Sequence, residues 1–380
     1  MKERMEVKVA QEVLQKAVAQ VSKIVMAKPS YPILSNILVN VTSEGIMTLT
    51  TTDLDITISV SCGVDAKQNG RFTVPAKTFS DFVGFLPKLE VVLKQEKDKV
   101  RVLCGKHEAL FPVIPPEEFP EIPQVGEEEE PLVTVKASVI KPVLDKVIFS
   151  CSHDISRPIF ATVYFEPVDD TLYLVGVDGF RLSRVIMKAD IKEGTNSFMI
   201  PYDALEEVSR FIEEDDELKI FQVKKGHHIV LKYSTVTIAS REVEGVYPDY
   251  KSVLPKEEKT KIILSTEEFL NGVKVAKLFT ADNVANRVEL VFENGNLVIR
   301  SEGSEIGENK TEIEVESFEG ENFSAAFNGS FLTDVLSRIS TDKVVFATFA
   351  PSSDEKLRGG IFKELNNENF LHIVMPLASK

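Results

Sequence analysis

The stretch VAQEVLQKAVAQVSKIV, residues 9–25, decides the fold because it recurs twice in altered form further along the chain. It reads as a short strand that runs into an amphipathic helix, with Leu14 and Val18 on one apolar stripe. The stretches VKASVIKPVLDKVIFSC (135–151) and LSTEEFLNGVKVAKLF (264–279) follow the same order of events. A pattern that returns twice predicts a chain built from three like repeats.

The repeats are nearly evenly spaced. With Leu14, Ile140 and Leu270 as matching positions, the offsets are 126 residues (140 − 14) and 130 residues (270 − 140). Three repeats of this size account for nearly all of the 380 residues, and polar segments separate them at 122–132 and 253–261. The predicted domains are 1–125, 126–254 and 255–380.

Each repeat also has a second half of the same form. RFTVPAKTFSDFVGFL (71–86), SFMIPYDALEEVSRFI (197–212) and NFSAAFNGSFLTDVLSRI (322–339) all read as strand, turn and helix. Between the helices the strands alternate apolar and polar residues, as in LYLVGVDGFRLSRV (172–185). The sequence therefore predicts an α+β fold with three similar domains, each with two helices packed on one side of antiparallel sheets.

Two local signals bear on the first helices of the repeats. Ser265 stands three residues before Glu268, which is the spacing of a capping box, and the helix that follows is expected to bury Leu270 and Val273. Pro142 falls within the helix expected in the second repeat, where it is tolerable in a first turn but would kink an interior.

Composition narrows the class of protein. Apolar residues make up 43% and charged residues 27% of the chain, which is ordinary for a globular protein. No apolar run approaches the length of a membrane span, and the start lacks the apolar core of a signal peptide. Cys62, Cys104 and Cys151 are far apart and odd in number, so we expect a reducing, cytoplasmic compartment.

The net charge is −15 (44 − 59), which argues against nonspecific wrapping of nucleic acid. The outward faces of the expected helices nevertheless carry Lys and Arg, with the acidic excess expected mostly elsewhere. These cations either form an ordinary solvated surface or line the concave side of an arc that binds a polyanion weakly, with an affinity on the order of 10⁻⁴ to 10⁻⁶ M. The candidate helix-face cations are Lys16, Lys23, Lys77, Lys88, Lys141, Lys146, Arg210, Lys274, Lys277 and Arg338.

No catalytic motif is visible. The sequence has no phosphate-binding GxxxxGK[ST], no GxGxxG after a strand, no HExxH and no GxSxG. The five histidines have no metal-ligand spacing, so no metal and no cofactor are expected. Two alternatives stay open: an enzyme with an unrecognised site that uses Asp53 or Asp178, and a repeat scaffold without a nucleic-acid role.

Six short motifs in a fixed order point to a known family. They are PILSNILV (32–39), TTDLD (51–55), FPEIP (119–123), VGVDGFRLS (175–183), YPDYKSVLP (247–255) and IVMPL (373–377). With the three-fold repeat, they make the whole chain resemble the bacterial DNA polymerase III β subunit, the sliding clamp family.

The resemblance implies a function without catalysis. Clamps of this family are homodimeric rings whose helices line the hole and whose sheets form the outside. A protein similar to them would encircle double-stranded DNA regardless of sequence, hold it topologically, and need no cofactor and no membrane. It would bind the catalytic subunit of DNA polymerase III, the clamp loader and other proteins that carry a clamp-binding motif.

The resemblance adds two basic residues to the expected DNA contacts. Lys28, in MAKPSYPIL, matches a loop position where the family places a DNA-contacting cation, and Arg157, in HDISRPIF, falls in a DNA-proximal loop. Pro158 and Ile159 stand where some members have aromatic residues, which argues against stacking at this point.

The family's partner site is a hydrophobic pocket that receives an extended peptide. Arg181 would orient the peptide, and Met375 could repack around different ligands. Phe180 stands where His is common, and Ala378-Ser379-Lys380 replaces a usual Arg-Leu end, so partner preference is expected to differ. The matching residues are Phe160, Val177, Gly179, Phe180, Arg181, Leu182, Pro248, Ser252, Val253, Ile373, Val374, Met375, Pro376 and Leu377.

Ring closure in the family joins the first domain of one copy to the third domain of the other. Ala109 and Phe111 on a strand of the first repeat, and Leu278 and Phe279 at a helix end of the third, match that interface. Taken alone, Leu278 and Phe279 could equally belong to the core of their own domain.

Overall fold

The computed structural model describes residues 5–26, 29–126, 128–154, 156–223, 226–280, 286–303, 307–350 and 359–378. The chain divides into two compact units. Unit 1 comprises Met1–Ser138 and Glu207–Glu242, and unit 2 comprises Val139–Glu206 and Val243–Lys380. The second repeat therefore contributes to both units, and its helices α3 (Ala137–Val147) and α4 (Tyr202–Phe211) run across the divisions of the chain.

Unit 1 holds the elements of the first repeat and the closing strands of the second. Its helical elements are α1 (Gln11–Val21), η1 (Ser22–Ile24), η2 (Pro32–Ser35), α2 (Ala76–Phe85) and η3 (Pro116–Glu118). Its strands are β1 (Glu6–Ala10), β2 (Asn36–Val41), β3 (Ile46–Thr52), β4 (Ile56–Gly63), β5 (Asp65–Ala66), β6 (Gly70–Pro75), β7 (Glu90–Gln95), β8 (Lys99–Cys104), β9 (His107–Pro112), β10 (Val133–Lys136), β16 (Glu217–Val223), β17 (His228–Tyr233) and β18 (Val236–Arg241).

Two antiparallel sheets organise unit 1. One has the strand order β5-β1-β7-β8-β9, and the part of a nine-stranded sheet that belongs to unit 1 runs β10-β16-β17-β18-β4-β3-β2-β6. In the second sheet, β18 pairs with β4, so that Ile238 lies opposite Ile58. A strand of the second repeat thus continues the sheet of the first.

Unit 2 holds the remaining elements of the second repeat and all of the third. Its helical elements are η4 (Ile148–Ser150), η5 (Pro158–Ala161), η6 (Tyr250–Val253), α5 (Thr266–Leu278) and α6 (Gly329–Leu336). Its strands are β11 (Thr162–Val168), β12 (Thr171–Val177), β13 (Arg181–Lys188), β14 (Asp190–Ile191), β15 (Phe198–Pro201), β19 (Thr260–Ser265), β20 (Arg287–Glu293), β21 (Asn296–Gly303), β22 (Gly307–Glu314), β23 (Ser317–Gly320), β24 (Phe323–Asn328), β25 (Lys343–Phe349), β26 (Gly359–Glu364) and β27 (Asn367–Val374).

The same kind of joint recurs in unit 2. A nine-stranded sheet has the order β15-β11-β12-β13-β27-β26-β25-β19-β23, and a four-stranded sheet has the order β22-β21-β20-β24. Strand β13 of the second repeat pairs with β27, the last strand of the third, so that Leu182 lies opposite Ile373. All of these pairings are antiparallel.

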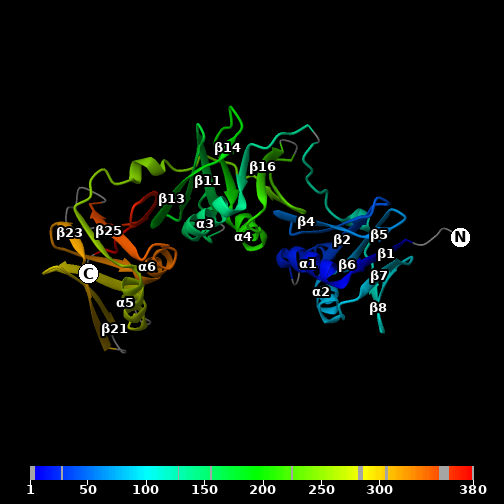
Figure 1. Ribbon diagram of the computed structural model, residues 1–380, viewed down its shortest axis with the longest axis horizontal. Coiled ribbons are helices and arrows are strands. Elements are labelled where there is room, and N and C mark those ends of the chain that lie inside the picture. The colour runs from blue at the N-terminus through cyan, green and yellow to red at the C-terminus, as the bar shows by residue number, and fades with distance from the viewer. Residues whose placement is uncertain are drawn as a thin grey trace. The chain divides into compact units, whose positions relative to one another are not determined.

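The predicted order of strand and helix is confirmed in all three repeats. Helices α1, α3 and α5 begin directly after β1, β10 and β19. Helix α1 packs against α2 and α5 against α6 (Figure 1), as expected for helix pairs on one side of a sheet. The hydroxyl of Ser265 accepts the backbone N–H of Glu268 at 3.3 Å, which is the N-cap contact that the sequence predicts.

The predicted match of Leu270 with Leu14 and Ile140 is wrong by one residue. Leu14, Ile140 and Phe269 each lie three residues into their helices and are fully buried, whereas Leu270 is only half-buried. Since α5 begins at Thr266, right after the Ser265 cap, the inward stripe starts at Phe269 and continues to Val273. Pro142 lies inside α3, on its exposed side.

Candidate functional site

Two exposed cations of unit 1 are ion-paired with carboxylates, and one of them, Lys88, lies between α2 and β7 and not on a helix as predicted. The Lys16 ammonium on α1 lies 2.6 Å from a carboxylate oxygen of Glu213, just after α4. The Lys88 ammonium lies 2.6 Å from a carboxylate oxygen of Glu12 on α1. All four side chains are more than half exposed, so solvent screens the pairs and they contribute little to stability.

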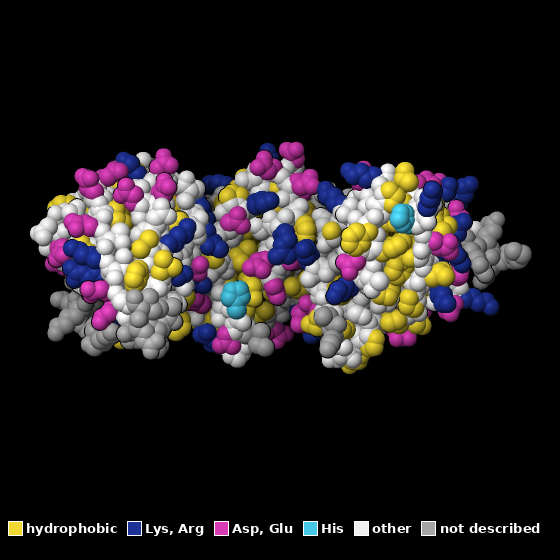
Figure 2. Space-filling view, turned by 90° about the horizontal axis from the view of Figure 1, so that it is seen from below, with side chains coloured by type: hydrophobic (Ala, Val, Ile, Leu, Met, Phe, Trp, Pro, Cys, Tyr) yellow, Lys and Arg dark blue, Asp and Glu magenta, His cyan; other side chains and the backbone are white. Residues whose placement is uncertain are grey.

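Arg210 and Arg157 each form an ion pair with a carboxylate three residues earlier in the sequence. Arg210 forms an ion pair with Glu207, one turn earlier on α4. Arg157 lies 3.0 Å from Asp154 and donates to the backbone carbonyl of Asp178 at 3.3 Å. Figure 2 shows acidic side chains next to basic ones in both units. The expectation that the acidic residues lie mostly away from the helices therefore does not hold for Glu12 and Glu207.

Lys146 is a structural cation rather than a surface one. Its ammonium, in a side chain only 14% exposed, lies 2.6 Å from the carboxylate of Glu364, whose side chain is 1% exposed. Burial alone would raise the pKa of Glu364, but hydrogen bonds from Lys146 and Ser340 outweigh it and hold the pKa below 4.5. Lys146 thus compensates a buried negative charge at the end of β26.

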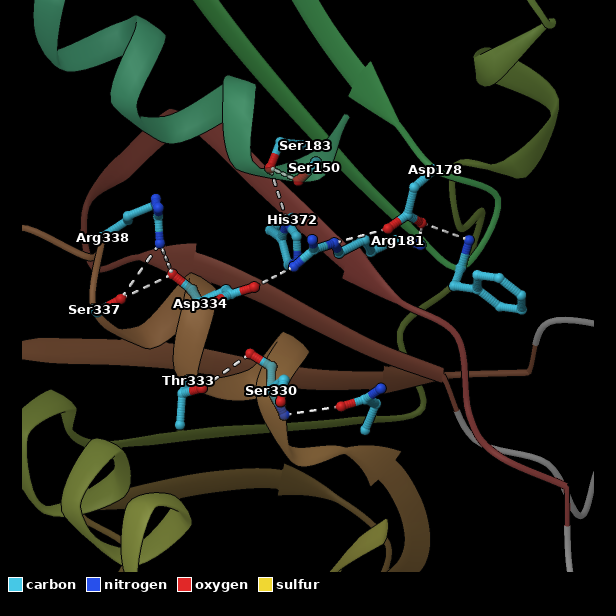
Figure 3. Close-up of polar contacts among 12 residues, drawn as sticks. Ser150, Asp178, Arg181, Ser183, Ser330, Thr333, Asp334, Ser337, Arg338 and His372 are labelled. Carbon is cyan, nitrogen blue, oxygen red and sulfur yellow. Dashed lines mark hydrogen bonds and ion pairs between the residues drawn. The ribbon is translucent and has the colours of Figure 1, made fainter. Parts of the chain in front are cut away.

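Arg338 is likewise held within unit 2. Its guanidinium donates to the backbone carbonyl of Asp334 at 2.8 Å (Figure 3). It also donates to the backbone carbonyl of Asp145 at 2.9 Å and lies 4.3 Å from the ring centroid of Phe149. Burial lowers its pKa. These contacts fasten the chain after α6 to the end of α3, and they leave little of the side chain for another ligand.

The remaining helix-face cations differ in exposure. Lys23, Lys77 and Lys274 are exposed, and within the part of the chain that the structure describes none of them forms an ion pair. Lys277 is half-buried and donates to the Thr333 hydroxyl at 3.3 Å. Lys141 is half-buried, and Lys28 lies outside the described residues. The positions of these side chains do not show whether they contact DNA. The role of the predicted cations in DNA binding therefore stays a prediction.

Several of the residues predicted for a peptide pocket lie in or against one apolar cluster at the β13–β27 joint. Leu182 and Ile373, opposite each other across the joint, are each 3% exposed. Val177 packs, half-buried, against the cluster to which both belong. The buried members of this cluster are Val175, Leu182, Met199, Tyr247, Tyr250, Ala347, Phe349, Ile361 and Ile373.

Two tyrosines anchor the linker that carries the next pocket residues. The ring of Tyr247 stacks on Tyr164 with centroids 4.6 Å apart, and its hydroxyl donates to the backbone carbonyl of Val175 at 3.1 Å. The Tyr250 hydroxyl donates to Glu166 at 2.5 Å, and burial together with this carboxylate raises the pKa of Tyr250. Pro248, Ser252 and Val253 lie on this anchored segment.

Several apolar side chains remain accessible around the joint. Phe180 is 58% exposed, Val253 is 55% exposed and Met375 is 37% exposed. The backbone N–H of Met375 donates to the carbonyl of Phe180 at 2.8 Å, which ties the end of the chain to the β12–β13 turn. The predicted pocket residues thus combine a buried base with an exposed apolar rim.

Arg181 is the member of this set with the strongest polar contacts. Its side chain is 9% exposed and lies between two carboxylates, at 2.9 Å from Asp178 and 2.6 Å from Asp334 (Figure 3). The guanidinium also lies 4.4 Å from the ring centroid of Phe331. Direct orientation of a peptide by Arg181 stays a prediction, although its Nε and one terminal nitrogen already donate to these carboxylates.

The two aspartates considered for catalysis each accept backbone hydrogen bonds from the turn in which they lie. Asp53 accepts the backbone N–H groups of Asp55 and Ile56, and burial raises its pKa. Asp178 accepts those of Phe180 and Arg181. Among the described residues, no group of three or more His, Cys, Asp or Glu could hold a metal ion. None of the described helices is long and apolar enough to cross a membrane.

The residues predicted for ring closure lie at an edge strand and a helix end. β9 is the last strand of its sheet, with Ala109 half-buried. Phe111 is 5% exposed because it packs edge-on against Phe79 and Phe82 of α2. In the third repeat, Leu278 is 69% exposed and Phe279 is half-buried, so Leu278 is not a core residue of its domain.

Phe85, at the last position of α2, is a candidate site residue that was not predicted from the sequence. Its side chain is 87% exposed, the most exposed phenylalanine among the described residues. The signal was present in the spacing of Phe79, Phe82 and Phe85, since three aromatics at intervals of three follow one face of a helix. Phe79 is buried at one end of that face and Phe85 emerges at the other. Figure 2 shows hydrophobic side chains gathered on the surface of the first repeat, at the N-terminal end of the molecule.

Comparison with models of known protein families assigns the chain to one family. Three models of the DNA polymerase III beta subunit match in succession: the N-terminal domain over residues 5–123, the central domain over 134–249 and the C-terminal domain over 251–378. The chain belongs to the DNA polymerase III beta subunit family. Sliding clamps of this family are non-catalytic processivity factors, so the predicted family and the prediction that the chain is not an enzyme are confirmed.

Curated relatives cover nearly the whole chain. The beta sliding clamp of Bacillus subtilis is 26% identical over 377 residues, which are 96% of this chain and 97% of the relative. That of Pseudomonas aeruginosa is 27% identical over 376 residues, which are 97% of this chain and 98% of the relative.

Solved structures confirm the predicted α+β clamp fold with three domains. The DNA polymerase sliding clamp from Bacillus subtilis has a TM-score of 0.91 at 25% identity and covers 100% of both chains. The DNA polymerase III subunit beta from Pseudomonas aeruginosa has a TM-score of 0.89 at 26% identity and covers 99% of this chain and 100% of that one.

Replacing Lys146 by Met should lower the free energy of unfolding by about 3 kcal/mol, because it leaves a buried carboxylate without its cation. In the native chain the lowered pKa of Glu364 stabilises the fold above about pH 4.5, and this contribution is lost as the pH falls through the folded-state pKa. In the variant, burial is no longer offset by Lys146 and raises the pKa of Glu364. The loss in the free energy of unfolding should therefore be greatest near pH 7 and become smaller toward about pH 4.5.

Urea unfolding followed by circular dichroism between about pH 4.5 and pH 8 measures this effect. The exposed Lys274→Met is the matched control and should leave the midpoint nearly unchanged. Equal midpoints for the two variants at neutral pH would show that the Lys146–Glu364 pair is dispensable.

Proposed function

We propose that two copies of this chain close into a ring around duplex DNA and tether the replicative DNA polymerase as a processivity factor. The observation that carries the proposal is the succession of three beta-subunit models along residues 5–378. The domain boundaries 1–125, 126–254 and 255–380 and a cytoplasmic location belong to the same proposal. The sheet joints β4–β18 and β13–β27 support it, because they connect neighbouring repeats by backbone hydrogen bonds rather than by flexible linkers alone.

Weak contact with DNA is the mode of binding that the charges support. Lys16, Lys88 and Arg210 already pair with carboxylates, and the chain carries a net charge of −15. Phosphates would have to compete with these internal anions, so affinity for DNA as such stays low. A closed ring does not need high affinity, because it is retained by its topology and remains free to slide.

Ring closure would pair the β9 side of one copy with the third repeat of the other. The β9 strand is a sheet edge, which offers backbone groups for pairing. Near it are two exposed apolar side chains, Leu110, which is 47% exposed, and Phe85, which is 87% exposed. Leu278 and Phe279 supply the complementary apolar surface at the end of α5. Burial of these side chains would stabilise a head-to-tail dimer.

The apolar rim around the β13–β27 joint is the proposed docking place for partner proteins. An extended peptide with apolar side chains would contact Phe180, Val253 and Met375, above the buried base formed by Leu182 and Ile373. The polymerase catalytic subunit, the clamp loader and other proteins with a clamp-binding motif would share this place, since Met375 can adapt its shape.

Topological binding predicts a sharp difference between closed and open DNA. After loading by the clamp loader, the protein should remain on nicked circular DNA through gel filtration and dissociate when one restriction cut linearises the circle. Leu278→Asp should abolish retention, because a buried charge opposes dimer formation. Equal retention on circular and linear DNA would rule out encirclement and favour ordinary binding.

The exposed helix lysines should contribute to DNA contact. Changing Lys23, Lys77 and Lys274 together to Glu should reduce the amount of protein loaded on circular DNA severalfold, because three attractive charges become repulsive. The matched control changes the exposed Lys67, Lys97 and Lys261, which lie on turns and a strand, to Glu. An equal loss in both triple variants would indicate net charge alone, and no loss in either would favour a scaffold without a DNA role.

The apolar rim should bind polymerase through side chains that the fold does not need. Phe180→Ala should weaken binding of the polymerase catalytic subunit about tenfold or more, because a central aromatic contact is lost. Phe318→Ala is the matched control, since both phenylalanines are 58% exposed. Surface plasmon resonance with immobilised polymerase measures both, and unchanged binding by the Phe180 variant would place the docking surface elsewhere.

A further inference from the structure

We propose that Arg181 and Asp334 are positioning residues for peptide binding: they fix the turn at 178–180 and thereby set where Phe180 and Met375 lie. Arg181 is then no direct ligand of the peptide. This inference rests on the proposed peptide-binding function, and it assigns a role in that function to Asp334 on α6, outside the predicted pocket residues.

The turn between β12 and β13 is held from within by one carboxylate. Asp178 accepts the backbone N–H groups of Phe180 at 2.8 Å and Arg181 at 2.9 Å with one oxygen, and the Arg181 guanidinium at 2.9 Å with the other. Gly179 has φ +96°, a conformation that other residues adopt with strain. The turn conformation therefore depends on where Asp178 is held, and Arg181 holds it.

Arg181 is in turn fixed by the third repeat. A guanidinium nitrogen lies 2.6 Å from Asp334 on α6, and its plane packs 4.4 Å from the ring centroid of Phe331, on the same helix. The ring centroid of Phe149 also lies near the guanidinium, at 5.5 Å. With 9% exposure, the side chain has little freedom to reach a ligand in solvent (Figure 3). Without Asp334 the guanidinium would stay paired with Asp178 but would lose the ion pair that ties it to α6.

The buried histidine next to this connection adds no further positive charge. His372 lies on β27, fully buried, and shares a hydrogen bond of 2.8 Å with the Ser183 hydroxyl, which also contacts Ser150 at 2.8 Å. Burial and the nearby charges of Arg181 and Arg338 hold the pKa of His372 well below 6.5. The imidazole is therefore neutral at physiological pH and does not repel the guanidinium.

The position of the turn is transmitted to the exposed rim. The carbonyl of Phe180 accepts the backbone N–H of Met375 at 2.8 Å, directly beyond the pairing of Arg181 with Val374. Phe180 and Met375 are the two exposed apolar side chains that this hydrogen bond connects. If Asp334 no longer holds Arg181, the turn gains freedom, and a peptide must order the rim when it binds.

The experiment measures binding of a fluorescein-labelled peptide that carries the clamp-binding motif of the cell's own replicative polymerase to the full-length protein, by fluorescence anisotropy. Asp334→Asn keeps the side-chain shape and removes the charge, and it should weaken binding about fivefold to twentyfold. Asp342→Asn, an exposed aspartate in the turn after α6, is the matched control and should bind as the unmodified protein does.

A second readout separates positioning from a loss of stability. With methyl-¹³C-methionine labelling, the Met375 methyl resonance should shift or broaden in Asp334→Asn without peptide, and not in Asp342→Asn, while the urea midpoints stay similar. Arg181→Lys should produce the same shift, because an ammonium cannot hold both carboxylates in the same geometry. Combined with Asp334→Asn, it should weaken binding by less than the product of the single effects.

Two outcomes would overturn the proposal. Unchanged affinity together with an unshifted Met375 resonance in Asp334→Asn would show that the connection does not set the rim. Full additivity of the Arg181 and Asp334 changes would make Arg181 a direct ligand. If the unmodified protein does not bind the peptide at all, the proposed docking function fails, while the methyl resonance still reports whether α6 positions the rim.

Discussion

Backbone pairing across the borders of the repeats is the constraint on which the other features depend. Strand β18 continues the sheet of β4, and β27 continues the sheet of β13. Each such pair is a row of hydrogen bonds that must be satisfied once the strands are buried. Because of this pairing the chain divides into two compact units although its sequence repeats three times. Leu182 and Ile373, two of the predicted pocket residues, lie together because β13 and β27 are neighbours.

Several of the cations that the sequence placed on helix faces are engaged by the protein itself. Lys146 and Arg338 are bound by partners inside unit 2, whereas Lys16 and Lys88 are balanced by exposed carboxylates. The first two serve the fold, since their partners are a buried carboxylate and backbone carbonyls. A role in contacting a polyanion is therefore best supported for the exposed lysines that have no acidic partner among the described residues.

Period and order in the sequence were sufficient to predict the repeats, the helix positions and the antiparallel sheets, because burial imposes regular spacing. The register of the third repeat was missed by one residue, since Leu270 and Phe269 are both apolar and only the helix start at Thr266 distinguishes them. The engagement of Arg181 could not be predicted, because Asp334 lies 153 positions away in sequence and is brought close only by the sheet. Phe85 was overlooked because exposure cannot be judged from an apolar helix stripe alone.

The carboxylates beside Lys16 and Lys88 have a consequence for the thermodynamics of sliding. A phosphate that contacts such a lysine must first displace a carboxylate that the protein itself supplies, so these lysines should neutralise fewer phosphates than their number would suggest. The dependence of affinity on ionic strength should then be shallow. A clamp of this kind would move along DNA with similar freedom over a range of intracellular salt concentrations.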